Sequence, residues 1–184
     1  MTIAESYTSL ARMLDYPKNK EILQADSDGV SGFLLEHDFA CPLVPFAGFV
    51  ARSTLADLQE DYVATFDFNP AVAPYLGHHL YGDNQKKGAY MIMIKQEFAR
   101  HEFTPLGNEL PDHLPLVLGF LAHLAQQKKD RVRQAFISES ILPGLERLNT
   151  GFADRQNSPW KAVVEAAKLL CAADTATCEE EKTC

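Results

Sequence analysis

The sequence predicts an all-α, single-domain multi-helix bundle, and three observations lead to this fold class. Apolar residues recur at helical spacing along most of the chain, no stretch alternates like a half-buried strand, and no internal repeat is present. The length of 184 residues fits one domain, with 46% hydrophobic and 23% charged residues. We expect residues 1–173 to form one helical domain and the polar, acidic residues 174–184 to form a flexible tail.

The N-terminal part of the chain predicts two helices and a broken apolar segment. The first helix has one apolar face, and Pro17 should end it. That face consists of Ile3, Tyr7, Leu10 and Leu14. A second helix is expected over residues 18–26, because Ser27-Asp28-Gly29 is typical of a turn. The apolar segment that follows is interrupted by Pro42 and Pro45, so its helices should be short.

The middle of the chain predicts three more helices. Thr54 followed by Asp57 has the spacing of a capping box. Its helix has an apolar stripe of Leu55, Leu58, Tyr62 and Phe66. Asn69-Pro70 should start a helix that ends near Gly82, and Asp83 should cap the next one. The stripe of that helix is Tyr90, Met91, Ile94 and Phe98.

The C-terminal half predicts helices with the broadest apolar faces. Asp112 is a candidate cap for the first of them, whose face is Leu114, Val117, Leu118, Leu121 and Leu124. Asp130 is a candidate cap for the next, which Pro143-Gly144 should kink or split. Ser158-Pro159 should start the last helix. Its stripe is Trp160, Val163, Val164, Ala167 and Leu170.

The charge and the cysteines narrow the class of function. A net charge of −8 repels phosphate backbones and anionic lipids, so neither nucleic acid nor a membrane surface is an expected partner, although −8 is also an ordinary solubility charge. No basic leader precedes an apolar segment and no apolar run approaches the roughly 20 residues that span a bilayer, so we expect a cytoplasmic protein without stable membrane insertion. The four cysteines (Cys41, Cys171, Cys178 and Cys184) form no C-x-x-C pair and predict neither a disulfide framework nor a zinc site.

The segment E-L-P-D-H-L-P at residues 109–115 is the chain's most unusual feature. It places Glu109, Asp112 and His113 directly before a very hydrophobic helix. Helix capping accounts for Asp112, at about 0.5–2 kcal/mol, but helix physics requires neither Glu109 nor His113. The three side chains are therefore candidates for catalysis, for metal binding or for recognition of a partner.

The spacing of the other titratable residues disfavours the first two uses. His79 and Asp83 are four residues apart, as helical metal ligands often are, but a glycine between them should break the helix. The chain has no nucleophile-elbow motif, no phosphate-binding glycine loop and no dinucleotide fingerprint. The rival hypothesis from another class is a small helical metal-dependent hydrolase that uses Asp112 and His113 together with His78 and His79.

Four motifs in order resemble a known family. They are Y-V-A-T-F-D at 62–67, H-H-L-Y-G-D at 78–83, K-G-A-Y-M at 87–91 and E-L-P-D-H-L-P-L at 109–116. Together they resemble the NarJ branch of the TorD/DmsD redox-enzyme maturation chaperones, the nitrate reductase delta-subunit type. The chain departs from some branches at Leu110, where they have proline, and its basic residues after the H-G-like turn are only Lys86 and Lys87. These departures leave the identity of the client enzyme open.

The resemblance implies a cytoplasmic chaperone that is not an enzyme and has no cofactor of its own. It would bind the N-terminal region of the apo catalytic subunit of a nitrate-reductase-like molybdoenzyme, often a twin-arginine-like segment, until the molybdenum cofactor is inserted. The implied client-peptide-binding residues are Glu109, Asp112, His113, Tyr62 and Asp67. Physical chemistry agrees, because paired arginines before an apolar run require carboxylates beside an apolar groove, and the helix that begins at Leu114 supplies apolar surface.

Overall fold

The computed structural model describes the backbone of residues 1–180 and the side chains of residues 1–176. Within this range the all-α class is confirmed, since there is no strand and the single isolated β-bridge joins Tyr75 to His113. The α-helices are α1 (Ile3–Met13), α2 (Lys20–Glu36), α3 (Val44–Arg52), α4 (Leu55–Tyr62), α5 (Leu76–Tyr81), α6 (Gln85–Arg100), α7 (Leu114–Gln126), α8 (Asp130–Phe136), α9 (Leu142–Gly151) and α10 (Pro159–Glu180). Shorter π-helical segments are η1 (Val63–Asp67) and η3 (Ile137–Ile141), and 3-10 segments are η2 (Pro70–Val72) and η4 (Ala153–Arg155).

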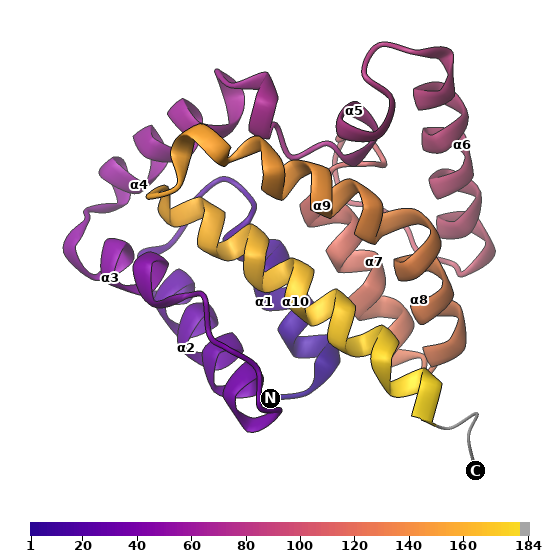
Figure 1. Ribbon diagram of the computed structural model, residues 1–184, viewed down its shortest axis with the longest axis horizontal. Helices are drawn as coiled ribbons and strands as arrows, with labels where there is room; N and C mark the ends of the chain where they lie inside the picture. The colour runs from indigo at the N-terminus through magenta and orange to yellow at the C-terminus, as the bar shows by residue number, and fades with distance from the viewer. Residues whose placement is uncertain (181–184) are drawn as a thin grey trace.

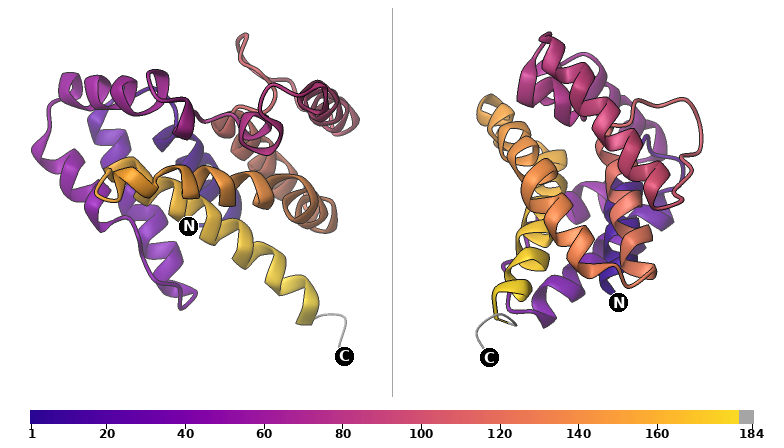
Figure 2. Two further views of the ribbon diagram at one scale, coloured as in Figure 1. Left: turned by 45° about the horizontal axis from the view of Figure 1, so that its top comes forward. Right: turned by 90° about the vertical axis from the view of Figure 1, so that its right-hand side faces the viewer.

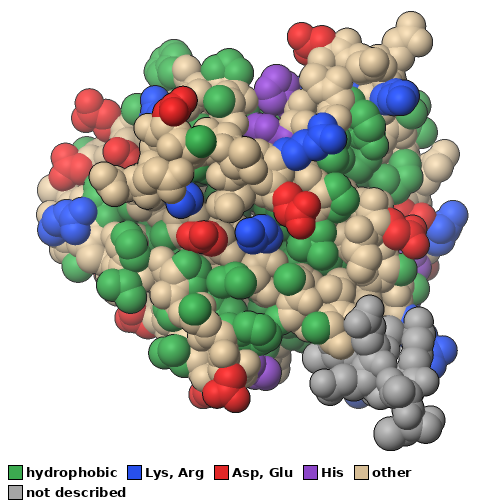
Figure 3. Space-filling model, in the orientation of Figure 1, with side chains coloured by type: hydrophobic (Ala, Val, Ile, Leu, Met, Phe, Trp, Pro, Cys, Tyr) green, Lys and Arg blue, Asp and Glu red, His purple; other side chains and the backbone are tan. Residues whose placement is uncertain are grey.

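Helix α1 lies at the centre of the arrangement. It packs against α2, α7 and α10, and α10 also contacts α3, α8 and α9 (Figure 1). Helix α6 lies at the edge of the molecule beside α5 (Figure 2). Acidic and basic side chains are interspersed on the face that α10 crosses (Figure 3). None of the helices in the described part of the chain is long and apolar enough to cross a membrane.

The core contains two groups of aromatic side chains. At one end Trp160, which is fully buried, lies 5.3 Å from the Tyr62 ring and 5.2 Å from the Phe46 ring. At the other end the rings of Phe98 and Phe120 are 4.8 Å apart. The apolar faces expected for α7 and α10 are confirmed, because every residue assigned to them is buried. Burial of these faces is the main source of stability for the bundle.

The expected turn at residues 27–29 is wrong, because α2 continues through it to Glu36. The reason is tertiary. The carboxylate of Asp26 is buried and accepts hydrogen bonds from Ser9 Oγ and from Arg12 Nε of α1, each at 2.8 Å. Val30, one turn further along, is also buried against the core. These contacts outweigh the local turn preference of Ser-Asp-Gly.

Helix boundaries in the middle of the chain also differ from expectation. The Asn-Pro pair starts only the short segment η2, and the two histidines lie on the separate helix α5. Helix α5 starts where the backbone pairs with the segment around His113. Asn84, not Asp83, caps α6, because Asn84 has the extended backbone of a cap residue and its Oδ1 accepts a hydrogen bond from Lys86 N at 3.0 Å. The capping box of Thr54 and Asp57 is confirmed.

Two further expectations concern α8 and α9. Asp130 is the first residue of α8 and makes no side-chain cap bond; its carboxylate pairs with Arg133 instead. The kink or split expected at Pro143-Gly144 does not break the helical backbone, which runs from Asp130 to Gly151 and changes to the π-helical segment η3 just before α9, in whose first turn Pro143 lies. A proline is tolerated there because the first-turn amides have no intrahelical partner.

The boundary expected at residue 173 is wrong for Asp174, and α10 continues through Glu180. Asp174 is buried, and its carboxylate accepts hydrogen bonds from Arg133 Nε and Nη2, each at 2.7 Å, and from Tyr7 Oη at 2.8 Å. A side chain that local composition assigns to a polar tail is therefore part of the core. The tail expected for residues 181–184, with Cys184, lies outside the described residues, as does the side chain of Cys178.

Candidate peptide-binding groove

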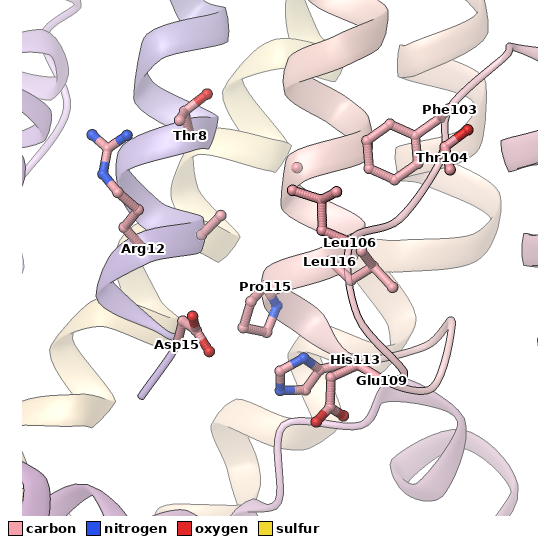
Figure 4. A pocket seen from close by; sticks show the side chains of 12 residues that line it. Thr8, Arg12, Asp15, Phe103, Thr104, Leu106, Glu109, His113, Pro115 and Leu116 are labelled. Carbon is pink, nitrogen blue, oxygen red and sulfur yellow. The ribbon is translucent and has the colours of Figure 1, made fainter. Parts of the chain in front are cut away.

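A groove of about 390 Å³ lies between α1, α7 and the loop that joins α6 to α7. Its apolar walls include Phe103, Leu106, Pro115 and Leu116, and its charged or titratable side chains include Asp15, Glu109 and His113. Figure 4 shows Asp15, Glu109 and His113 at one end and Phe103 towards the other. The groove therefore has an acidic end and an apolar end, and the E-L-P-D-H-L-P segment contributes to the acidic end.

The acidic end has little cationic compensation. Arg12 also lines the groove, but its guanidinium pairs with Asp26 on α2. Lys18 Nζ lies 2.7 Å from Asp15 Oδ2 in the exposed segment after α1, and a surface pair of this kind contributes at most about 1 kcal/mol. Glu109 is exposed and forms no ion pair within the described part of the chain. A cationic ligand can thus pair with Glu109 without displacing a strong internal partner.

His113 is buried beside this carboxylate. Its ring centroid lies 5.1 Å from that of Tyr75. Burial lowers the pKa of His113 below its usual 6.5, against the opposing influence of the charges on Glu109, Asp15 and Asp112. The imidazole is therefore neutral at pH 7 and does not repel a cation at the acidic end.

This pKa shift makes stability depend on pH. Between the lowered pKa of folded His113 and the unfolded value of 6.5, the unfolded chain binds the proton more strongly, so stability present above pH 6.5 is lost as pH falls. We expect His113→Gln to reduce the slope of unfolding free energy against pH between 7 and 5.5, by up to about 1.4 kcal/mol per pH unit. Urea denaturation at several pH values measures this slope.

The prediction needs a control for a second buried histidine and a direct titration of His113. Burial also lowers the pKa of His79, which contributes in the same pH range, so the wild type must be compared directly with the variant. Titration of the His113 ring protons by NMR should give a midpoint below 6.5 in the folded chain. A midpoint at or above 6.5 would contradict the prediction.

Asp112 does not cap α7 as the sequence predicts. His113 occupies the cap position of α7 without a side-chain cap bond, and the fully buried carboxylate of Asp112 faces α5 instead. Its Oδ2 accepts a hydrogen bond from Gly77 N at 3.0 Å, and its backbone oxygen accepts one from Leu76 N at 3.0 Å. Its Oδ1 is buried without a hydrogen-bond partner. Asp112 thus joins the start of α5 to the loop before α7 and does not line the groove.

The other predicted site residues lie around the groove and do not line it. Leu114 is fully buried in the core. Tyr62 is buried too, and its hydroxyl donates a hydrogen bond to the Leu14 oxygen at 3.1 Å. Asp67 is exposed on η1. Burial, followed by the charges of Asp15 and Asp67, raises the pKa of Tyr62, so Asp67 adds to the negative field near the acidic end.

Sequence reasoning missed the residues that other elements bring to this site. Asp15 comes from the segment just after α1, and Phe103 and Leu106 come from the loop after α6. Leu106 lines the groove and is 94% exposed, so its apolar side chain is accessible to a ligand. Tyr75, just before α5, donates a hydrogen bond from its hydroxyl to Glu109 Oε2 at 3.1 Å. These four residues lie outside the shared motifs, and Asp15 and Tyr75 are far along the chain from Glu109, so no local pattern linked them to the site.

The rival metal site is not assembled. Among the residues that the structure describes, no three His, Cys, Asp or Glu side chains gather closely enough to hold a metal ion. The Nε2 atom of His79 lies 2.7 Å from the Ala73 oxygen, in a hydrogen bond within the local backbone. The Oδ2 atom of Asp112 is bonded to Gly77 N, as described above. Two candidate ligands of the hydrolase hypothesis, His79 and Asp112, are thus engaged in separate hydrogen bonds.

Comparison with known proteins agrees with the fold and with the motifs. Residues 34–164 match the family model described as nitrate reductase delta subunit. NarJ of Escherichia coli K12, a nitrate reductase molybdenum cofactor assembly chaperone, is 35% identical over 72 residues, which cover 39% of this chain and 30% of NarJ. The probable NarJ of Bacillus subtilis is 32% identical over 99 residues, 53% of this chain and 54% of that protein. The matches thus cover less than two thirds of either relative.

A solved structure shares the fold over almost the whole chain. The structure of a putative redox enzyme maturation protein from Archaeoglobus fulgidus covers 97% of this chain and 95% of its own, with a TM-score of 0.59 and 15% sequence identity. That likeness concerns the fold alone, whereas the family match spans more than half of the sequence and includes all four motifs. The chain belongs to the nitrate reductase delta subunit family.

Proposed function

We propose that this chain is an assembly chaperone and not an enzyme. It binds the apo catalytic subunit of a nitrate-reductase-type molybdoenzyme in the cytoplasm, where the client is synthesised, and holds it competent for insertion of the molybdenum cofactor. Membership of the delta subunit family supports this, as do the names of relatives that are themselves molybdenum cofactor assembly chaperones. The client contact is assigned to the N-terminal region of that subunit.

The observation that carries the proposal is the groove with one acidic and one apolar end. An N-terminal segment with arginines followed by apolar residues is complementary to it in both charge and polarity. Glu109 can pair with a guanidinium through its carboxylate, and the neutral His113 beside it adds no repulsion. Apolar side chains of the client would bury against Phe103 and Leu106 at roughly 25 cal/mol per Å².

The predicted site residues then divide into two groups. Glu109 and His113 line the groove and are assigned to client contact. Asp112, Leu114 and Tyr62 are buried and support the groove from behind. Asp67 contributes long-range charge from η1.

Binding of a synthetic peptide tests this function. The peptide carries two arginines followed by an apolar segment, and its Kd for the full chain is measured by calorimetry. Loss of a hydrogen bond to a charged group costs about 1.5–3 kcal/mol, so Glu109→Gln should weaken binding roughly tenfold to a hundredfold. The matched control is Glu102→Gln, an exposed acid on the same loop that does not line the groove.

The same variants should act on the client in cells. Co-expression with the catalytic subunit of a nitrate-reductase-type molybdoenzyme, followed by assay of its molybdenum content, should show reduced loading for Glu109→Gln and normal loading for Glu102→Gln. Unchanged peptide affinity together with unchanged loading in Glu109→Gln would show that the groove is not the client site. Stoichiometric, chelator-sensitive metal in the purified chain, accompanied by hydrolase activity, would instead support the rival hydrolase.

A further inference from the structure

We infer that Tyr75 is a positioning residue that determines how strongly the groove selects a cationic client segment. This inference rests on the proposed function and adds to it a specificity determinant that lies outside the four shared motifs. Tyr75 acts through Glu109 and does not line the groove itself.

The first step concerns the freedom of Glu109. Its side chain is exposed, and the hydrogen bond from Tyr75 Oη to Glu109 Oε2, at 3.1 Å, is the contact that restrains its carboxylate. No other hydrogen bond or ion pair to this carboxylate is present within the described chain. The Oε1 atom remains available to a guanidinium. A carboxylate already held in place loses less side-chain entropy when a cation binds.

The second step concerns what holds Tyr75. Tyr75 immediately precedes α5, and backbone hydrogen bonds on both sides fix its position. Leu76 N donates to the Asp112 oxygen at 3.0 Å, and Leu114 N donates to the Pro74 oxygen at 2.8 Å. The Tyr75 ring also packs beside His113, with centroids 5.1 Å apart. The hydroxyl is therefore presented to Glu109 from a rigid base.

This arrangement gives Asp112 an indirect role. Its Oδ2 atom accepts a hydrogen bond from Gly77 N and so ties the first turn of α5 to the loop that carries Glu109. Buried Asp112 cannot contact a client directly, but it keeps Tyr75 and Glu109 in register. Asp112 thus positions Tyr75, Tyr75 positions Glu109, and Glu109 is the residue of the three that pairs with the cation.

The test compares two synthetic peptides that share one apolar segment. One carries an Arg-Arg pair and the other Gln-Gln at the same positions, and each is titrated into the full wild-type chain and into Tyr75→Phe. The wild type should prefer the Arg-Arg peptide by roughly tenfold or more. Tyr75→Phe keeps the ring and removes the hydroxyl, so it should reduce this preference by roughly threefold or more and leave the Kd for the Gln-Gln peptide unchanged.

Two further variants complete the design. Tyr81→Phe is the matched control, because Tyr81 is half-buried at the other end of α5 and its hydroxyl makes no hydrogen bond within the described chain; it should keep the wild-type preference. Glu109→Asp keeps the charge but is one methylene shorter, so it should lose contact with the Tyr75 hydroxyl and show the same reduced preference as Tyr75→Phe.

The outcomes separate this inference from the proposed function. If Tyr75→Phe kept both the affinity and the Arg-Arg preference of the wild type, the role of Tyr75 would be overturned and the proposed function would stand. An equal loss of affinity for both peptides in Tyr75→Phe would show a structural role and would overturn the inference as well. If the wild type bound neither peptide, the proposed function and this inference would both be wrong.

Discussion

Replacing Asp174 with alanine should lower the free energy of unfolding by about 3–5 kcal/mol. Asp174 is 6% exposed and Arg133 is 3% exposed, and the two form a pair with two hydrogen bonds of 2.7 Å. The variant would leave the Arg133 guanidinium buried, with Asp130 as its one carboxylate partner among the described side chains, and would also remove the 2.8 Å bond from the Tyr7 hydroxyl. Urea denaturation followed by circular dichroism measures the change.

A double variant and a surface pair are the controls for Asp174. Arg133→Met combined with Asp174→Leu removes both charges and should recover much of the loss, because an uncompensated buried charge is then absent. Arg100→Met breaks the exposed pair with Glu97 and should change stability by no more than about 1 kcal/mol. A loss below about 1 kcal/mol for Asp174→Ala would show that the pair does not anchor α10 to α1 and α8.

Gly77→Ala should lower the free energy of unfolding by roughly 2–4 kcal/mol. It should also weaken binding of the Arg-Arg peptide to the groove. A Cβ atom on Gly77 would lie 2.8 Å from Asp112 Oδ2 and 3.1 Å from Tyr90 Cδ1. The fully buried carboxylate would have to move away from Gly77 N, its hydrogen-bond partner, although its other oxygen already has none. The start of α5 would shift, and Tyr75 with it.

Gly88→Ala is the matched control for Gly77. Gly88 lies within α6, and a Cβ atom there would meet nothing within 4 Å. Because glycine costs roughly 0.5–1 kcal/mol relative to alanine inside a helix, this variant should be stabilised by about that amount and should bind both peptides normally. Denaturation and calorimetry on both variants measure the two effects. Wild-type stability and affinity in Gly77→Ala would contradict the proposed link between Asp112 and the groove.

Local patterns predicted the helices whose signals lie within the helix itself. The broad apolar faces of α7 and α10 were predicted residue by residue, because a face buried by many neighbours must be apolar at helical spacing. The capping box of Thr54 and Asp57 was predicted for a similar reason, since both partners lie within one turn. The shared motifs likewise pointed to Glu109 and His113, which do line the groove.

The errors arose where distant side chains compete for a polar residue. Asp26, Asp112 and Asp174 each looked like a local feature: the last residue of a helix, a helix cap and a tail residue. In the structure each carboxylate binds a partner on another element instead. A buried carboxylate requires such partners, and no local pattern shows which element will supply them.

The sequence by itself determined the helical class, the main buried faces, the family and two residues of the groove, because periodicity, capping and motifs are encoded within short stretches. Only the tertiary structure decided what surrounds those two residues. Asp15 and Tyr75 lie near Glu109 and His113, and Phe103 lines the other end of the same groove, so this arrangement depends on how α1, α5 and α7 pack. That packing made Asp112 a link between elements, where the sequence alone predicted a helix cap.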